Sequence, residues 1–397
     1  MELPTIRGGQ PVRSNYLVFG SPEILDDEIN EVVETLRSCW IGTGPRVSNF
    51  EGLFKNYIGS EYAKALNSCT AGLFLSLKVA GIKEGDEVIT SPLTFASTAN
   101  VIYHCGAIPV FVDVNKDTMN INAGLIEKSI TKRTKAIIPV HFAGRPCEMD
   151  KILEIAKKHN LIVIEDAAHA IESKYKGKKI GNIGDLTCFS FYATKNVVTG
   201  EGGMVTTNKK EWAEKIETLA LHGLSKGAWQ RYSDKGFRHY EVVHPGYKFN
   251  MMDLQAALGI HQLKRVESNL IKREKIWRRY DEALSELPLT TPSPVGKSIK
   301  HGRHLYTILL NLDKLKVNRN EFQEALHYEN IGTGIHFIAL HLHKFYKENL
   351  NYKRGAFPNA EFISDRTISL PLSSKLTDQD INDVIHAVKK LCKFYSK

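Results

Sequence analysis

The sequence lacks a long hydrophobic run, a secretory leader and closely paired cysteines. Its 397 residues contain no stretch of about 18 uninterrupted apolar side chains, which argues against a membrane span. The N-terminal segment, MELPTIRGGQPVRSNYLVFG, has no apolar core of the kind found in signal peptides. The six cysteines form no Cys-x-x-Cys pair, which disfavours disulfides and a zinc site. We therefore expect a cytoplasmic protein with reduced thiols and no bound metal.

The charge surplus is modest and evenly spread. The chain carries 53 basic and 44 acidic residues, a net charge of +9, without a basic run interleaved with aromatic residues. This distribution is typical of a solvated surface and disfavours nucleic acid as a partner. A small positive surplus also suits polyanionic ligands such as nucleotide diphosphates.

The length and the order of elements favour two lobes. In the first two-thirds, short apolar or β-branched runs predict strands at 87–90, 108–114, 135–140, 161–165, 186–192 and 203–206, among helices such as 71–80 and 149–159. This alternation is typical of a mostly parallel sheet covered on both faces. A charged helical stretch, 252–284, leads to a smaller region with a strand at 305–310 and helices at 319–327 and 378–395. We predict a large α/β domain, 1–265, and a small C-terminal α+β domain, 266–397.

Polar side chains follow several of the predicted strands. Asp166 and His169 come after one strand, Lys195 and Asn196 after another, and Thr70 stands at the start of a helix. In open parallel sheets, ligands bind beyond the carboxyl ends of the strands. An acid, a lysine, a histidine and a hydroxyl-rich helix start at one edge therefore predict a ligand site.

These residues match the needs of a pyridoxal-phosphate site. That cofactor needs a lysine for a Schiff base, a carboxylate that keeps its pyridine nitrogen protonated, and a helix N-terminus for its phosphate. Lys195, Asp166 and the helix start at Thr70 and Ala71 fill these roles, and Phe95 offers a ring to stack on the cofactor. Each residue alone has an ordinary explanation as a surface lysine, a helix cap or a core side chain. The argument depends on their order and local sequences.

Nine ordered segments carry a more specific signal. They are TGPRVSNFE (43–51), ALNSCTAGLFLSL (65–77), GDEVITSPLTFASTAN (85–100), GAIPVFVDV (106–114), KAIIPVHFAGRPCEMD (135–150), VIEDAAHAIESKYKGKKIG (163–181), CFSFYATKNVVTGEGGMV (188–205), PGYKFNMMDLQAALG (245–259) and IGTGIHF (331–337). In this order they resemble the DegT/DnrJ/StrS family of nucleotide-sugar aminotransferases, which are fold-type I pyridoxal-phosphate enzymes. The resemblance covers about residues 8–391 and implies an aspartate-aminotransferase-like α/β fold with a large, mostly parallel sheet.

The resemblance implies a role for each matching residue. Lys195 looks like the Schiff-base lysine, Asp166 like the partner of the pyridine nitrogen, and His169 stands where the family has Gln or His near the phenolic oxygen of the cofactor. The other cofactor-binding residues that we expect are the phosphate contacts Thr70, Ala71 and Ser190, the stacking residue Phe95, Asn196 beside the lysine, and Lys248.

Lys248 implies a dimer. It lies in a loop that, in the family, reaches the cofactor phosphate of the other subunit, and a lysine there suits a phosphate electrostatically. We therefore expect a homodimer with shared active sites.

The family also implies the reaction. A branch with His in place of the lysine performs dehydration, so Lys195 favours a transaminase over a lyase. The implied donor is L-glutamate and the implied acceptor is a nucleotide-linked keto sugar, which yields an amino sugar for surface glycan or related biosynthesis. The IGTGIHF and TGPRV segments resemble enzymes that act at C4 of 4-keto sugars, with His336 and Thr43 as candidate sugar contacts; similar segments also occur in C3 aminotransferases.

Two hypotheses of other classes have weaker support. A regulatory sensor without catalysis predicts a DNA-binding segment, and we find neither a helix-turn-helix nor spare length for one. A Rossmann dehydrogenase predicts a Gly-x-Gly-x-x-Gly motif after the first strand, and GEGG (200–203) lacks that spacing.

Overall fold

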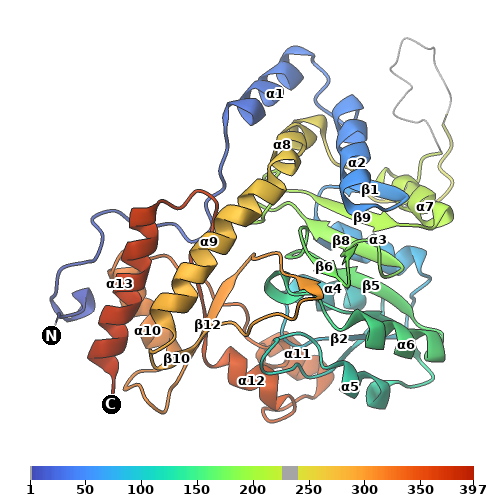
Figure 1. Ribbon diagram of the computed structural model, residues 1–397. Coiled ribbons are helices and arrows are strands. Elements are labelled where there is room, and N and C mark those ends of the chain that lie inside the picture. Colours follow the sequence, from blue (N-terminus) through green and yellow to red (C-terminus); the bar gives the residue numbers. More distant parts are fainter. Residues whose placement is uncertain (1, 226–239) are drawn as a thin grey trace.

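The computed structural model describes residues 2–225 and 240–397. A seven-stranded sheet forms its centre, and β9 is the one strand of the seven that runs antiparallel to its neighbours (Figure 1). The prediction of an α/β fold with a mostly parallel sheet is confirmed. The strands in spatial order are β1 (Tyr62–Leu66), β9 (Gly203–Thr207), β8 (Leu186–Ser190), β5 (Ile162–Asp166), β4 (Thr134–Ile138), β2 (Glu87–Thr90) and β3 (Ile108–Phe111).

Helices cover both faces of this sheet because successive strand residues point to opposite sides. On β8, Cys188 packs with the helices α3 (Cys69–Val79), α4 (Ala96–His104) and α7 (Lys210–Ala220), whereas Phe189 packs with α2 (Pro45–Ile58) and α8 (Asp253–Lys264) on the opposite face. On β4, Ile138 packs on the same face as Cys188, whereas Ile137 points to the opposite face and packs with α6 (Met149–His159). Two buried faces explain why these strands read as continuous apolar runs.

The C-terminal part has a core of its own. An antiparallel sheet of β10 (Leu289–Thr290), β12 (Tyr306–Leu310) and β13 (Thr367–Leu370) packs with α9 (Val266–Leu284), α10 (Arg319–Tyr328) and α13 (Asp378–Tyr395). The remaining named elements are α1 (Asp26–Arg37), α5 (Ala123–Ile126), α11 (Lys344–Leu350), α12 (Pro358–Ser364) and a small sheet of β11 (Ile299–Lys300), β6 (Lys174–Tyr175) and β7 (Lys178–Lys179), with short 3-10 turns at Thr5–Arg7, Glu127–Ser129, Phe142–Gly144 and Leu340–Leu342.

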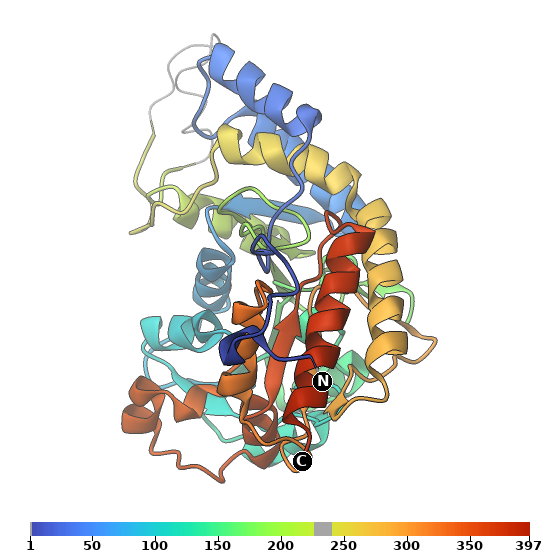
Figure 2. The same cartoon turned by 90° about the vertical axis from the view of Figure 1, so that its left-hand side faces the viewer.

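The N-terminal segment lies against the C-terminal helices. The buried Glu329 carboxylate accepts hydrogen bonds from the backbone amides of Thr5 and Val12 and pairs with Lys390 of α13 at 2.9 Å. Both views place the two chain ends close together beside α13 (Figure 2). The predicted domain division at 265/266 stays a prediction.

Two predicted elements differ from the observed ones, and in each a side chain near the point of difference contacts a distant part of the chain. The helical stretch 252–284 is two helices that meet at Arg265 (φ −99°, ψ −2°), whose guanidinium bonds to Glu28 and to the Glu23 carbonyl. The strand predicted at 108–114 ends at Phe111. Beyond it, the Asp113 carboxylate accepts the backbone amides at the start of α12, and its backbone carbonyl accepts the Asn122 amide.

The rest of the sequence-based outline agrees with the structure. The strand at 87–90 and the helices at 149–159 and 378–395 have the predicted bounds. Within the two described ranges, none of the helices combines the length and apolarity needed to cross a bilayer. All six cysteines are free thiols.

Candidate active site

A cavity of about 470 Å³ lies at the carboxyl ends of β4, β5 and β8. This is the edge at which the sequence predicts a ligand site, because the loops after parallel strands meet there. Seven of the predicted residues line the cavity: Thr70, Phe95, Asp166, His169, Ser190, Lys195 and His336.

Lys195 reaches the cavity from the turn after β8. Its backbone amide donates to the Tyr192 carbonyl at 2.8 Å, which closes the turn and directs the segment back toward the sheet edge. Burial lowers the pKa of the Lys195 ammonium, although the Cys69 and Asp166 groups nearby oppose that shift. A lowered pKa increases the share of neutral amine, which is the nucleophilic and basic form.

Asp166 ends β5 with its side chain buried at the floor of the cavity. The Thr98 hydroxyl of α4 donates to Oδ2 at 2.8 Å, and the Ala168 amide donates to Oδ1 at 3.2 Å. Burial raises the pKa of this carboxyl group, while the Thr98 hydrogen bond opposes the shift. The Thr98 hydroxyl in turn lies 2.9 Å from that of Thr94, so two hydroxyl groups support one carboxylate.

The N-terminus of α3 points at the same cavity. Ser68 caps the helix, and its hydroxyl accepts the Ala71 amide at 3.1 Å; Thr70 follows in the first turn and lines the cavity. A helix N-terminus attracts anions through its free N–H groups and its dipole. Gly203 of β9 permits this packing, because a Cβ atom there would lie 2.4 Å from the Ser68 carbonyl carbon and 2.5 Å from the Cys69 nitrogen.

Aromatic rings and imidazoles form the opposite wall. Phe95, 64% exposed at the start of α4, lies 6.3 Å from Phe337 between ring centroids. His169 accepts the Ala143 amide through Nδ1 at 3.3 Å, so the neutral ring carries its proton on Nε2. His336 contacts the Ser369 hydroxyl through Nδ1 at 2.9 Å.

Both cavity imidazoles are neutral at physiological pH. Burial lowers the pKa of His169 well below its usual value and that of His336 to about 3, and the Lys195 ammonium adds to both shifts. The wall therefore presents neutral hydrogen-bonding groups, and the cationic group beside it is the lysine.

The other predicted residues lie outside this cavity. Ala71 is buried, with its amide taken by Ser68. The Thr43 hydroxyl donates to the Met251 carbonyl at 2.5 Å, which ties the 40–44 loop to the segment before α8. Lys248 is exposed, and its backbone pairs with Leu221.

The Asn196 side chain turns away from the cavity. Its amide nitrogen bonds to Glu172 and to the Gly302 carbonyl, and its amide oxygen bonds to His304. Asn196 therefore does not line this cavity, and its predicted cofactor contact stays a prediction.

Sequence reasoning missed several lining or supporting residues. Thr98 lies three residues after Phe95, which is one helical turn, and this spacing is the signal that would have placed its hydroxyl on the same side of α4. Glu201 and Phe337 line the cavity from segments whose family resemblance is clear, GEGG and IGTGIHF. Tyr192 also lines it, two residues beyond β8.

Comparisons with known proteins agree with this geometry. The sequence profile of the DegT/DnrJ/EryC1/StrS aminotransferase family matches residues 22–389. The spore coat polysaccharide biosynthesis protein SpsC of Bacillus subtilis is 52% identical over 383 residues, which cover 96% of this chain and 98% of that protein.

Solved structures give the same picture. A protein described as a sugar aminotransferase, Spr1654 of Streptococcus pneumoniae, in its PLP form, has a TM-score of 0.88 at 34% identity, covering 96% of this chain and 99% of that one. PseC of Helicobacter pylori, described as an aminotransferase involved in pseudoaminic acid biosynthesis, has a TM-score of 0.89 at 31% identity, covering 96% of this chain and all of its own.

Proposed function

This chain belongs to the DegT/DnrJ/EryC1/StrS aminotransferase family, and we propose that it transfers an amino group from L-glutamate to C4 of a nucleotide-linked keto sugar. It is a sugar aminotransferase that depends on pyridoxal phosphate. The observation that carries the proposal is the meeting of the Lys195 amine, the buried Asp166 carboxylate and the N-terminus of α3 in one cavity.

The residues present fit the cofactor. A buried carboxylate supported by Thr98 suits a protonated pyridine nitrogen, because an opposite charge compensates the burial of each group. The helix start at Thr70 suits the phosphate, and the close approach that Gly203 allows keeps that helix start against the sheet. When bound, the cofactor supplies an electron-withdrawing ring that stabilises charge on the carbon that loses a proton.

The chain's own residues then hold or move protons. Lys195 would hold the cofactor covalently and, once released, take a proton from the donor carbon through Nζ, for which a lowered pKa is suitable. His169, with its proton on Nε2, would donate a hydrogen bond to the phenolic oxygen. Phe95 would cover one face of the ring and keep water away from it.

For the acceptor we propose a 4-keto, 6-deoxy nucleotide sugar, with a 3-keto sugar as the alternative. The support is the resemblance of the IGTGIHF and TGPRV segments to enzymes that act at C4. His336 from the first of these segments lines the cavity, in a neutral state that suits hydrogen bonding to sugar hydroxyls. Thr43 from the second would act only through the loop that it holds.

For the assembly we propose a cytoplasmic homodimer with shared sites. Lys248 is exposed and outside the cavity of its own chain, which suits a residue that serves the phosphate of the partner subunit. Mixing inactive Lys195→Ala and Lys248→Ala chains tests this directly. Mixed dimers with one intact site would regain activity, whereas full inactivity of the mixture would contradict sharing.

The absorbance spectrum of the purified protein tests the chemistry. Wild type should show the visible band of lysine-bound cofactor, and L-glutamate should bleach it toward the amine form. Lys195→Ala should lack that band. A wild type without the band after incubation with pyridoxal phosphate would overturn the roles of Lys195 and Asp166.

Product analysis tests the acceptor. The glutamate-treated enzyme, freed of glutamate, is given matched 4-keto and 3-keto nucleotide sugars, and the recovery of the visible band is followed with the formation of amino sugar. Amination of 3-keto but not 4-keto sugars would overturn the C4 assignment and leave the aminotransferase chemistry intact.

A further inference from the structure

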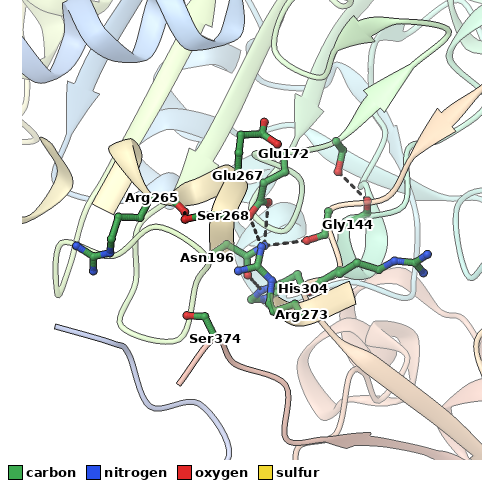
Figure 3. Close-up of polar contacts among 12 residues, drawn as sticks. Gly144, Glu172, Asn196, Arg265, Glu267, Ser268, Arg273, His304 and Ser374 are labelled. Atoms are coloured by element: carbon green, nitrogen blue, oxygen red, sulfur yellow. Dashed lines mark hydrogen bonds and ion pairs between the residues drawn. The ribbon is translucent and has the colours of Figure 1, made fainter. Parts of the chain in front are cut away.

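Asn196, the residue after Lys195, anchors a network of partly buried hydrogen bonds behind the cavity. Its amide nitrogen donates to a Glu172 carboxylate oxygen at 2.9 Å and to the Gly302 carbonyl at 3.1 Å, and its amide oxygen lies 2.9 Å from Nδ1 of His304. Figure 3 shows Glu172, Asn196, Arg273 and His304 gathered at one place. Both N–H donors of the Asn196 side chain, and one of the two acceptor positions of its oxygen, are thus used inside the protein.

A buried ion pair lies at the other end of this hydrogen-bond network. Glu172 is fully buried, and its second oxygen pairs with the Arg273 guanidinium of α9, which is only 3% exposed. Arg273 also donates through Nε to the Arg303 carbonyl at 3.1 Å. The loop after β5, the long helix of the C-terminal part and the lysine segment are therefore joined through one carboxylate.

The partners of Asn196 determine the tautomer of His304. A carboxylate and a carbonyl only accept hydrogen bonds, so the nitrogen of the Asn196 amide must face them. The amide oxygen then faces His304, which must donate from Nδ1. Burial lowers the pKa of His304 well below its usual value, so the ring carries one proton, on Nδ1.

His304 connects this network to the active-site cavity through a ring contact. Its ring packs against that of His169, with centroids 4.4 Å apart and planes at 35°. His169 lines the cavity, whereas His304 lies behind it. The orientation of the His169 ring therefore depends on a neighbour whose own orientation is set by Asn196.

The segment that carries Lys195 depends on these hydrogen bonds because side chains do not fill the space on the side of the segment opposite the active-site cavity. A second, small polar cavity of about 40 Å³ lies on its other side and is lined by Lys195, Asn196 and Arg273, among others. Lys195 thus borders an open space on both sides. The side-chain hydrogen bonds of the neighbouring Asn196 therefore add to the Lys195–Tyr192 backbone hydrogen bond in restraining this segment.

We propose that Glu172, Asn196 and His304 are positioning residues that form a relay from the Arg273 ion pair, holding the Lys195 amine and the His169 ring in place for proton transfer. The inference rests on the proposed roles of Lys195 and His169. None of the three relay residues lines the active-site cavity, so they act through those two groups.

The first test uses the cofactor-free protein and does not depend on catalysis. Two-bond proton–nitrogen correlation spectra of histidine-labelled protein distinguish Nδ1–H from Nε2–H rings. Wild type should show His304 protonated on Nδ1, and Asn196→Ala should lose that preference. Glu329→Gln is the matched control, since it breaks another fully buried ion pair, with Lys390, and neither of these residues lines the cavity; it should leave His304 unchanged.

The second test uses the cofactor-loaded enzyme. Asn196→Ala and Glu172→Gln should lower kcat by roughly tenfold with little change in KM, as expected when reacting groups are held less accurately. Glu172→Gln combined with Arg273→Met removes both buried charges, which guards against loss of folding through an unpaired arginine; it should show the same fall in kcat. The Glu329→Gln control should keep the wild-type kcat.

The results separate the relay from the proposed function. A wild-type His304 protonated on Nε2, or variants with unchanged tautomer and unchanged kcat, would overturn the relay. If the wild type shows the Nδ1 tautomer but never the visible band of lysine-bound cofactor, the relay stands as a structural arrangement and the role of Lys195 is overturned instead.

Discussion

Replacing Thr98 by valine isolates the support of the Asp166 carboxylate. Valine has nearly the same shape as threonine, so the buried site keeps its packing and loses one hydroxyl group. That hydroxyl is fully buried and donates to Asp166 at 2.8 Å. The change keeps the hydrogen bond from the Ala168 amide to this carboxylate and removes the partner of the Thr94 hydroxyl.

The size of the effect follows from the charge of the acceptor. A hydrogen bond to a charged group contributes about 1.5–3 kcal/mol, and one pKa unit corresponds to about 1.4 kcal/mol. The pKa of Asp166, already raised by burial, should therefore rise by about one to two further units in Thr98→Val. Because the cofactor needs the ionised carboxylate, the pH below which the protein releases pyridoxal phosphate should move upward by the same amount.

The assay is cofactor retention as a function of pH. Wild type and variant are loaded with pyridoxal phosphate, equilibrated across a pH series, and scored by the visible band that stays with the protein. Thr206→Val is the control, because Thr206 is equally buried and donates to the Gly181 carbonyl away from the cavity. Identical retention curves for wild type and Thr98→Val would refute the view that the Thr98 hydroxyl keeps Asp166 ionised.

Three further predictions use stability as the measurement. Burial raises the pKa of Asp166, so its charge destabilises the cofactor-free fold as pH rises through that pKa. Asp166→Asn should therefore raise the Tm of the cofactor-free protein by about 1–4 °C while abolishing tight cofactor binding. An unchanged Tm would contradict this prediction. Gly203→Ala places a Cβ against the Ser68 backbone and should cost about 1–3 kcal/mol in denaturant unfolding, whereas Gly52→Ala in α2, with open space around it, should be neutral or stabilising; equal effects would be inconsistent with the clash. Burial lowers the pKa of His336 to about 3, so its contribution to stability is lost as pH falls below its unfolded value of about 6.5, and His336→Asn should flatten the acid limb of a stability curve.

Local pattern accounts for most of the fold that could be predicted. Strands such as β2 and helices such as α6 and α13 were predictable because apolar periodicity and end signals agree within a few residues. The break at Arg265 was not, since no glycine or proline marks it; there the Arg265 side chain contacts Glu28, more than 230 positions away. The early end of β3 also coincides with a long-range contact, because the partner of Asp113 lies at the start of α12.

Some features of the candidate site were also predictable from the sequence, and others were not. The order of Asp166, Lys195 and the helix start at Thr70 along a βα pattern implies that they meet, because parallel strands end at one edge of the sheet. The spacing of Thr98 from Phe95 indicates the side of α4 on which its hydroxyl lies, but nothing in the sequence pairs that hydroxyl with Asp166, which comes from another element.

The order and chemistry of the residues by themselves predict a mostly parallel sheet with a lysine and a carboxylate at its edge. They also indicate the family to which the chain belongs. The tertiary structure decides what local pattern cannot encode: the direction of the Asn196 side chain, the tautomers of His169 and His304, and the neutral state of His336. These properties depend on burial and on partners far apart in the chain. The protonation state of a side chain and the direction of its hydrogen bonds are set by groups within a few ångströms in space. Only folding brings those groups together, so the order of residues in the sequence does not reveal them.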